Sequence, residues 1–200
     1  MQLQSLKILF LGDSYTVGEG VEAHDTYPAQ LVQKLKLQHK EVHYDIIAKT
    51  GWTTGELLEE IKKTSLSHDY DKVFLLIGVN NQYRGYSLQE YKTEFQELLS
   101  LSKRFCADKS ENVTVLSIPD WGVTPFAEGK DRRKIAEEID EFNKANKQIC
   151  LSQNIHRVDV TGISRKAGED HSLLAADQLH PSGRMYGMWT EVIVAVGGRQ

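Results

Sequence analysis

Five short apolar runs, rich in β-branched residues and separated by segments of helical periodicity, dominate the pattern of this chain. Each run is continuously hydrophobic, whereas a strand with one solvated face alternates apolar and polar residues. Continuous hydrophobicity is typical of parallel strands that are covered on both faces. We therefore predict five strands, at residues 7–11, 42–48, 72–77, 113–118 and 157–160.

The segments between these runs predict helices. Two of them begin with capping boxes, Thr53 with Glu56 and Ser87 with Glu90, in which each side chain binds a free backbone N–H of the first turn. Strands that alternate with helices require crossover connections, which are almost always right-handed. The expected fold is therefore α/β, a parallel sheet with helices on both faces. The expected helices cover residues 27–38, 54–64, 88–104, 132–152 and 182–196.

Size and composition limit the remaining possibilities. A chain of 200 residues with 40% hydrophobic content fits a single domain, residues 1–200, with its own core. The net charge of −4 and the mixing of Lys and Arg with Asp and Glu argue against nucleic acid as a partner. Cys106 and Cys150 match no metal-binding spacing and are expected to be free thiols, which favours a reducing compartment.

The ends of the sequence give an expectation about location. The first twelve residues contain no long apolar region with a small-residue cleavage site, and no segment has the roughly 20 apolar residues that a transmembrane helix needs. We therefore expect no transmembrane segment and a cytoplasmic protein, unless an export signal has been removed from the sequence. The sequence does not indicate the oligomeric state.

One serine stands where an open α/β sheet places its ligands. Ser14 follows the first apolar run directly, in Gly12-Asp13-Ser14, and ligands bind outside the carboxyl ends of such strands. Near the other end of the chain, Asp177 precedes His180 by three residues, so that a turn would bring its carboxylate to the imidazole. These three residues are candidates for a Ser-His-Asp triad, in which His180 activates the Ser14 hydroxyl.

Acyl transfer also requires donors for the negative charge that develops on the carbonyl oxygen. Gly51 follows the second predicted strand, and Asn80 follows the third. With the backbone N–H of Ser14, the N–H of Gly51 and the side-chain amide of Asn80 would form a three-donor oxyanion hole. No metal or organic cofactor is required by such a site.

The same residues resemble the sequence blocks of the SGNH hydrolases, also called GDSL lipases or esterases. The blocks are Gly12-Asp13-Ser14-Tyr15, then Gly51, then Gly78-Val79-Asn80-Asn81, and finally Asp177-Gln178-Leu179-His180. Asn81 stands where the family has an aspartate, and Tyr15 where its name expects Leu. The resemblance implies a flavodoxin-like three-layer α/β/α sandwich with a five-stranded parallel sheet, and hydrolysis of small-molecule esters or thioesters through an acyl-enzyme.

Substrate selection is left open by the sequence. Aromatic residues in loops at the same sheet edge are candidates for a substrate pocket, although such residues also serve as packing plugs; they are Trp52, Tyr83, Tyr86, Trp121 and Phe126. An acyltransferase, a lysophospholipase or a thioesterase would use the same scaffold. A non-catalytic flavodoxin-like binding module is the alternative from another functional class.

Overall fold

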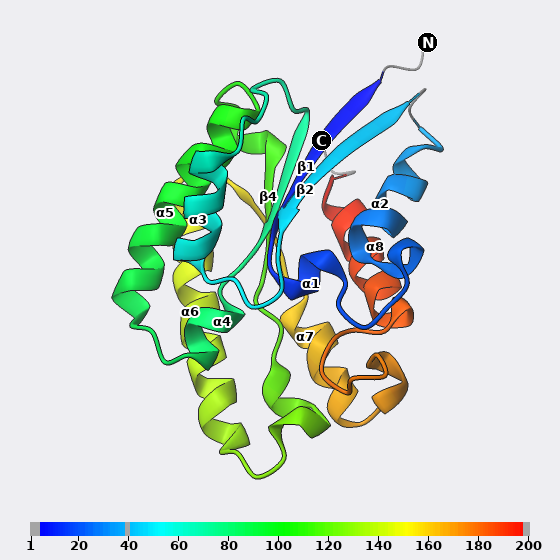
Figure 1. Cartoon of the computed structure of the whole chain (residues 1–200), viewed down its shortest axis with the longest axis vertical. Helices are drawn as coiled ribbons and strands as arrows, with labels where there is room; N and C mark the ends of the chain where they lie inside the picture. Colours follow the sequence, from blue (N-terminus) through cyan, green and yellow to red (C-terminus); the bar gives the residue numbers. More distant parts are fainter. Residues whose placement is uncertain (1–4, 39–40, 198–200) are drawn as a thin grey trace.

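A parallel sheet runs through the middle of the computed structural model, which describes residues 5–38 and 41–197 (Figure 1). Within these residues the sheet has five strands in the order β2-β1-β3-β4-β5. All neighbouring pairs are parallel. The strands are β1 (Leu6–Gly12), β2 (Val42–Ala48), β3 (Lys72–Leu76), β4 (Val113–Leu116) and β5 (His156–Val158).

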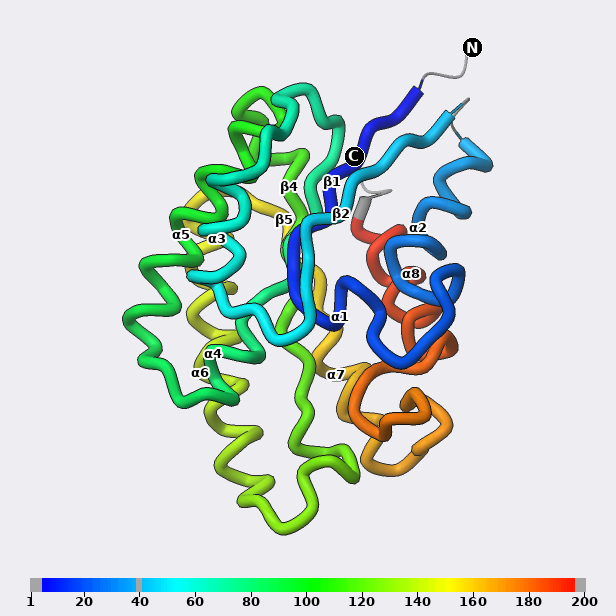
Figure 2. The backbone as a smooth tube through the Cα atoms, in the orientation of Figure 1, coloured from blue at the N-terminus to red at the C-terminus, as the bar shows by residue number. Residues whose placement is uncertain are grey.

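Helices cover both faces of this sheet, so the predicted three-layer α/β fold is confirmed. In Figures 1 and 2, α2 (Tyr27–Leu35) and α8 (Gly183–Gly197) lie on one side. The other side carries α3 (Thr54–Lys63), α5 (Leu88–Phe105) and α6 (Arg132–Ser152). Of the two predicted capping boxes, Thr53 and Glu56 make both reciprocal hydrogen bonds, and at Ser87 the side chain accepts from the Glu90 N–H.

Short helical turns occupy the loops, all but one of those described at the carboxyl end of the sheet; the exception, at residues 110–112, precedes β4. Four or five residues carry no readable periodicity, which is why the sequence pattern did not predict them. The α-helical turns are α1 (Ser14–Val17), α4 (Val79–Tyr83) and α7 (Thr161–Ser164). The 3₁₀ turns are η1 (Ala23–Asp25), η2 (Ser110–Asn112), η3 (Trp121–Val123), η4 (Pro125–Ala127), η5 (Arg165–Gly168) and η6 (His171–Leu173).

The central strands are the most deeply buried part of the core. In β1, the four residues from Ile8 to Leu11 have no solvent-exposed area, because helices cover them on both faces. The edge strand β2 differs, since Tyr44 and Ile46 remain partly exposed. The apolar run in β1 therefore reflects burial on two faces, whereas that in β2 does not.

The strand order creates a crevice beside β1. The chain passes from β1 to β2 on one side and returns to β3 on the other, and open sheets bind ligands at such a switch point. Gly12 ends β1 against β3, where a Cβ atom would lie 2.5 Å from the Leu76 carbonyl oxygen. Only glycine permits this approach, so the residue before the Asp13-Ser14 turn is fixed by the sheet itself.

The length and hydropathy of the described helices can be compared with those of a transmembrane helix. In that part of the chain, every helix is too short or too polar to cross a lipid bilayer.

Candidate active site

Ser14 is placed by the abrupt change from strand to helix at the end of β1. It is the first residue of α1, and the Asp13 side chain caps that helix by accepting from the Tyr15 N–H at 3.0 Å. The first N–H groups of a helix have no acceptor within the helix, so the Ser14 N–H is available to a ligand. Asp13 is buried, and burial raises its pKa from 3.8 to about 7 against the opposing hydrogen bond from Tyr15.

His180 and Asp177 form one tight turn before α8. One carboxylate oxygen of Asp177 accepts the backbone N–H groups of Leu179 and His180, both at 3.0 Å. The other oxygen lies 2.6 Å from Nδ1 of the His180 ring. Gln178 adopts φ +56° inside the turn, and the Ala175 N–H donates to the His180 carbonyl at 2.8 Å. The spacing of three residues therefore lets one carboxylate bind both the backbone and the ring of the histidine.

The two ends of the chain meet at this point. Nε2 of His180 lies 2.9 Å from Oγ of Ser14, although the residues are 166 positions apart. Burial tends to raise the pKa of the Asp177 carboxyl, but the hydrogen bonds from the His180 ring and from two backbone N–H groups hold it below the ordinary value. The Tyr15 ring packs beside the imidazole, with the ring centres 5.2 Å apart.

The two other predicted donors lie on neighbouring loops that brace each other. Nδ2 of Asn80 donates to the Trp52 carbonyl at 2.9 Å, which leaves the second amide hydrogen for a ligand. Gly51 adopts φ +87°, and its carbonyl accepts from Arg84 at 2.6 Å. Asn80 lines the cavity beside Ser14, whereas Gly51 and Trp52 are not among the lining residues.

Asn81 anchors the Asn80 loop to the start of α3. Its Oδ1 accepts the Thr54 N–H at 3.0 Å and its Nδ2 donates to the Thr54 hydroxyl at 2.7 Å. That hydroxyl in turn donates to the Glu94 carboxylate. Gly78, just before this loop, would place a Cβ only 2.7 Å from the Tyr91 ring. The asparagine at position 81 therefore supports the loop through both halves of its amide.

A cavity of about 130 Å³ adjoins the Ser14 hydroxyl and the His180 ring. Three aromatic residues predicted for the pocket lie in its wall, whereas Trp52 packs against the core and Tyr86 does not line it. Tyr15, Val79 and Leu179 also line it, although no sequence pattern indicated a pocket role for them. Besides Ser14, Tyr15 and His180, the lining residues are Val79, Asn80, Tyr83, Trp121, Phe126 and Leu179.

A second, larger cavity lies away from these groups. It measures about 250 Å³ and is lined by residues at the starts of the strands, such as Leu6 and Lys72. Ligand chemistry in open α/β sheets belongs to the opposite, carboxyl end of the strands. In the part of the chain that the structure describes, no three His, Cys, Asp or Glu side chains are grouped to hold a metal ion.

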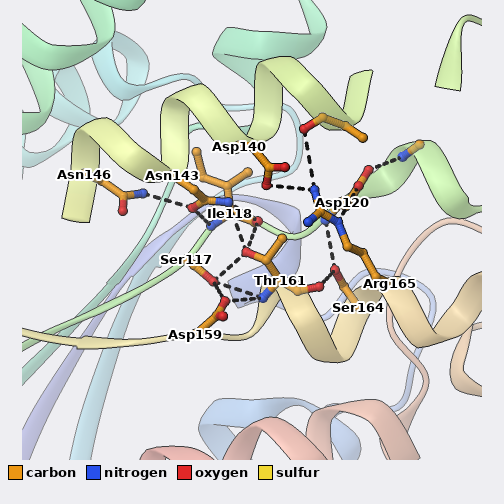
Figure 3. A network of polar contacts seen from close by, with 12 residues as sticks. Ser117, Ile118, Asp120, Asp140, Asn143, Asn146, Asp159, Thr161, Ser164 and Arg165 are labelled. Atoms are coloured by element: carbon orange, nitrogen blue, oxygen red, sulfur yellow. Dashed lines mark hydrogen bonds and ion pairs between the residues drawn. The ribbon is translucent and has the colours of Figure 1, made fainter. Parts of the chain in front are cut away.

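The loop that carries Trp121 is held by a buried polar network, drawn in Figure 3. The Asp120 side chain is fully buried, accepts the Gly122 N–H at 2.9 Å and pairs with Arg165 at 2.9 Å. Arg165 also binds Asp140 of α6 at 2.8 Å. The Asp120 N–H donates to the Ser164 hydroxyl at 2.9 Å. No local sequence pattern revealed the anchors Ser164 and Arg165, because they lie 44 and 45 residues from Asp120 along the chain.

Comparisons with known proteins agree with this architecture. Axe2, an acetylxylan esterase from Geobacillus stearothermophilus, superposes with a TM-score of 0.76 at 20% identity, covering 100% of this chain and 98% of that one. A lipolytic G-D-S-L family protein from Veillonella parvula gives a TM-score of 0.75 at 18% identity, with 98% and 100% covered. At these identities the likeness establishes a shared fold.

Relatives in sequence are named for different activities. The spore germination lipase LipC of Bacillus licheniformis is 24% identical over 96% of this chain and 97% of its own length. The N-acylneuraminate cytidylyltransferase of Streptococcus agalactiae is 24% identical over 86% of this chain. The chain spans only 34% of the length of that relative.

A match to a family model identifies the domain that this chain contains. The model of the GDSL-like lipase/acylhydrolase family matches residues 10–188, most of the chain. The match includes the Gly12-Asp13-Ser14 turn, the Asn80 loop and the Asp177–His180 turn, so the resemblance that these motifs suggested is confirmed. The chain belongs to the GDSL-like lipase/acylhydrolase family.

Proposed function

We propose that this chain is a serine esterase that hydrolyses small carboxylic esters or thioesters through an acyl-enzyme. The observation that carries the proposal is the unbroken series of contacts from the Asp177 carboxylate through both nitrogens of His180 to the Ser14 hydroxyl. A hydroxyl needs a base within hydrogen-bond reach to become a nucleophile, and the base needs a partner that fixes its tautomer. Both requirements are met by distances below 3 Å.

In the first half of the reaction, the Ser14 oxygen attacks the acyl carbonyl carbon while Nε2 of His180 takes the hydroxyl proton. Asp177 accepts a hydrogen bond from Nδ1–H and stabilises the imidazolium that forms. The oxyanion of the tetrahedral intermediate is met by the N–H groups of Ser14 and Gly51 and by the Asn80 amide. The bond to the alcohol or thiol then breaks, and His180 protonates the departing atom.

The second half repeats these steps with water. His180 removes a proton from the water as its oxygen attacks the acyl-enzyme, and the carboxylic acid leaves when the bond to Ser14 breaks. The same donors stabilise the second oxyanion. Restoring the Ser14 hydroxyl with the proton held by His180 completes the cycle.

The names of the related proteins support ester chemistry without agreeing on a substrate. They include an acetylxylan esterase, a lipase and an arylesterase from Vibrio mimicus that is 27% identical over 59% of this chain. An ester carbonyl is the group that their substrates share. These names therefore support a reaction type for this chain and leave its acyl preference open.

Covalent labelling of the nucleophile tests the proposal. A fluorophosphonate probe should modify Ser14, as mapped by mass spectrometry of the digested protein. Ser14→Ala should abolish labelling, and Ser14→Ala and His180→Ala should each reduce hydrolysis of p-nitrophenyl acetate by ~10⁴-fold or more. Equal hydrolysis by the wild type and both variants would refute the proposal and favour a non-catalytic binding module.

A cysteine variant provides the matched control. Cys150 is buried, and burial raises the pKa of its thiol to about 12, so it holds little thiolate at neutral pH. Cys150→Ser should retain both labelling and hydrolysis. Product analysis with an added acceptor alcohol separates hydrolysis from acyl transfer, since a transferase would form the new ester in preference to the free acid.

A further inference from the structure

The cavity beside Ser14 has a small volume and a mostly apolar wall. It measures about 130 Å³. A protein cavity of about 150 Å³ is large enough for benzene, which has six heavy atoms. The space beside Ser14 therefore holds about five heavy atoms, which corresponds to an acyl group of about two to four carbons.

One wall of the cavity comes from the short helix α4. Val79, Asn80 and Tyr83 line the cavity. Val79 and Tyr83 are four residues apart and therefore neighbours on one face of the helix. Asn81 and Gln82 point into the surrounding frame, where both are buried and hydrogen-bonded. The helix thus presents a donor and two apolar groups to the cavity and fixes them from behind.

The Trp121 ring forms a further part of the wall next to α4, and hydrogen bonds hold it in position. The indole N–H donates to Oε1 of Gln82 at 2.7 Å, and Nε2 of Gln82 donates to Glu138 of α6 at 2.8 Å. Trp121 is only 5% exposed, whereas the neighbouring Tyr83 and Phe126 are 50% and 45% exposed at the mouth. The Tyr83 ring meets the Trp121 ring edge-on at 5.2 Å.

The backbone of Trp121 is fixed as well. The preceding residue, Asp120, is tied to Arg165 and through it to Asp140, as Figure 3 shows. A ring that is held through its own nitrogen and through the adjacent residue cannot swing aside without breaking the buried hydrogen bond to Gln82 and leaving a buried polar group unsatisfied. Trp121 is therefore held at two points, whereas Tyr83 and Phe126 are about half exposed at the mouth.

We infer that Trp121 is the residue that limits the length of the acyl group, and that Gln82 is the positioning residue that holds it in place. This inference rests on the proposed esterase function and adds its substrate class, esters of short acyl chains of about two to four carbons. The alcohol portion lies outside the cavity, so its length has little effect on selection.

The test compares acyl and alcohol series in the same variants. With p-nitrophenyl esters, the wild type should prefer acetate and butyrate to octanoate. Trp121→Ala should raise the ratio of kcat/KM for octanoate to that for acetate by at least ~10-fold, because a methylene group in an apolar pocket is worth roughly 10–200-fold. Gln82→Met, which keeps the ring but removes its lock, should raise the ratio by a smaller factor.

Trp52→Ala is the matched control, because the Trp52 ring packs near the same loops without lining the cavity. It should leave the octanoate to acetate ratio within a factor of two or so, roughly 0.4 kcal/mol.

An unchanged ratio in both Trp121→Ala and Gln82→Met would overturn the inference, with fluorophosphonate labelling of Ser14 in each variant showing that the esterase site is intact. A ratio that changes with the alcohol series instead would also overturn it, since the cavity would then hold the leaving group. Labelling and hydrolysis that persist in Ser14→Ala would instead refute the proposed function, which is a different result from an unchanged ratio in an enzyme that depends on Ser14.

Discussion

The buried carboxyl of Asp13 has a raised pKa, which makes the stability of the protein depend on pH. Its side chain lies beneath the Ser14 turn with 1% of its surface exposed. Burial raises the pKa of this carboxyl from 3.8 to about 7, and the hydrogen bond from the Tyr15 N–H opposes the rise without cancelling it. Between these two values the folded protein holds a proton that the unfolded chain releases. The stability that Asp13 provides is therefore fully present below pH 3.8 and is lost as the pH rises through 7.

The size of the effect follows from the gap between the two pKa values. Each pH unit of separation corresponds to about 1.4 kcal/mol, so a gap of about three units changes the free energy of unfolding by about 4 kcal/mol. Asp13→Asn removes the titrating group and keeps a side-chain oxygen that can accept from Tyr15. The free energy of unfolding of the variant minus that of the wild type should therefore rise by about 4 kcal/mol between pH 4 and pH 8.

Urea unfolding at half-unit pH intervals measures this difference. Subtracting the free energies of unfolding of the two proteins at each pH cancels the contributions of the other titrating groups. Asp108→Asn is the matched control, because Asp108 is exposed at φ +59°, a conformation that asparagine tolerates. As an exposed substitution, it should change the free energy of unfolding by no more than about 0.5 kcal/mol. A flat difference for Asp13→Asn would refute the reasoning, since it would show that the buried carboxyl has the same pKa in the folded and unfolded chains.

Three further predictions concern the site and its support. Asn80→Ala should lower kcat for p-nitrophenyl acetate by ~10²–10³ with little change in KM, since we propose that its amide stabilises the oxyanion; a rise in KM at constant kcat would contradict this role. Asp177→Asn should lower kcat by ~10⁴ by changing the histidine tautomer, and activity within tenfold of the wild type would oppose it. Arg165→Met should cost about 3 kcal/mol in chemical unfolding because it leaves the Asp120 carboxylate buried without a cation. The exposed Arg133→Met should cost under about 0.5 kcal/mol, and equal costs for these two arginines would refute the distinction.

The sheet could be predicted because its physical cause lies within each strand. Residues 8–11 of β1 are fully buried, so every position is apolar and the run is visible without a partner. The strand ends could not be placed in the same way. Residues 117–118 were predicted to continue β4, but the Ile118 N–H donates to the Asn143 side chain and the chain leaves the sheet. The acceptor Asn143 lies on α6, so the residues around position 118 contain no local signal for the end of the strand.

The candidate triad was visible in the sequence for a local reason at both ends. Gly12 is required by the close contact with β3, and Ser14 follows at the strand end. Asp177 and His180 belong to one turn whose backbone and side-chain bonds require their spacing. The catalytic roles of these residues stay predictions until labelling tests them, but their identification needed no long-range information.

The cavity wall had no such local signal. Trp52 and Trp121 looked equivalent, because both follow strands at the same edge of the sheet. Only Trp121 lines the cavity, where Gln82 binds its indole nitrogen. The distinction is made by a residue 39 positions away, so that the sequence predicted the location of the pocket better than its lining.

Asn81 offers a case in which the residue expected from the family should be harmful in this chain. Its amide both accepts from the Thr54 N–H and donates to the Thr54 hydroxyl, whose only hydrogen is given to Glu94. An aspartate in its place would have no hydrogen to donate, so it would compete with Glu94 for the one hydroxyl hydrogen. Asn81→Asp should therefore destabilise the fold by at least about 1–3 kcal/mol, the cost of an unsatisfied buried acceptor.

A second substitution should rescue this defect. When Asn81→Asp is combined with Glu94→Gln, the amide of the new glutamine donates to the Thr54 oxygen, and the hydroxyl hydrogen is free to bind the aspartate. Glu94→Gln alone keeps an oxygen that can accept from Thr54, so its cost in the wild-type background should be small. Urea unfolding of the four proteins should give a favourable coupling of about 0.5–3 kcal/mol. If the effects of the two substitutions are additive, Asn81, Thr54 and Glu94 do not share a single hydrogen. The explanation of how this loop holds Asn80 beside Ser14 would then be wrong.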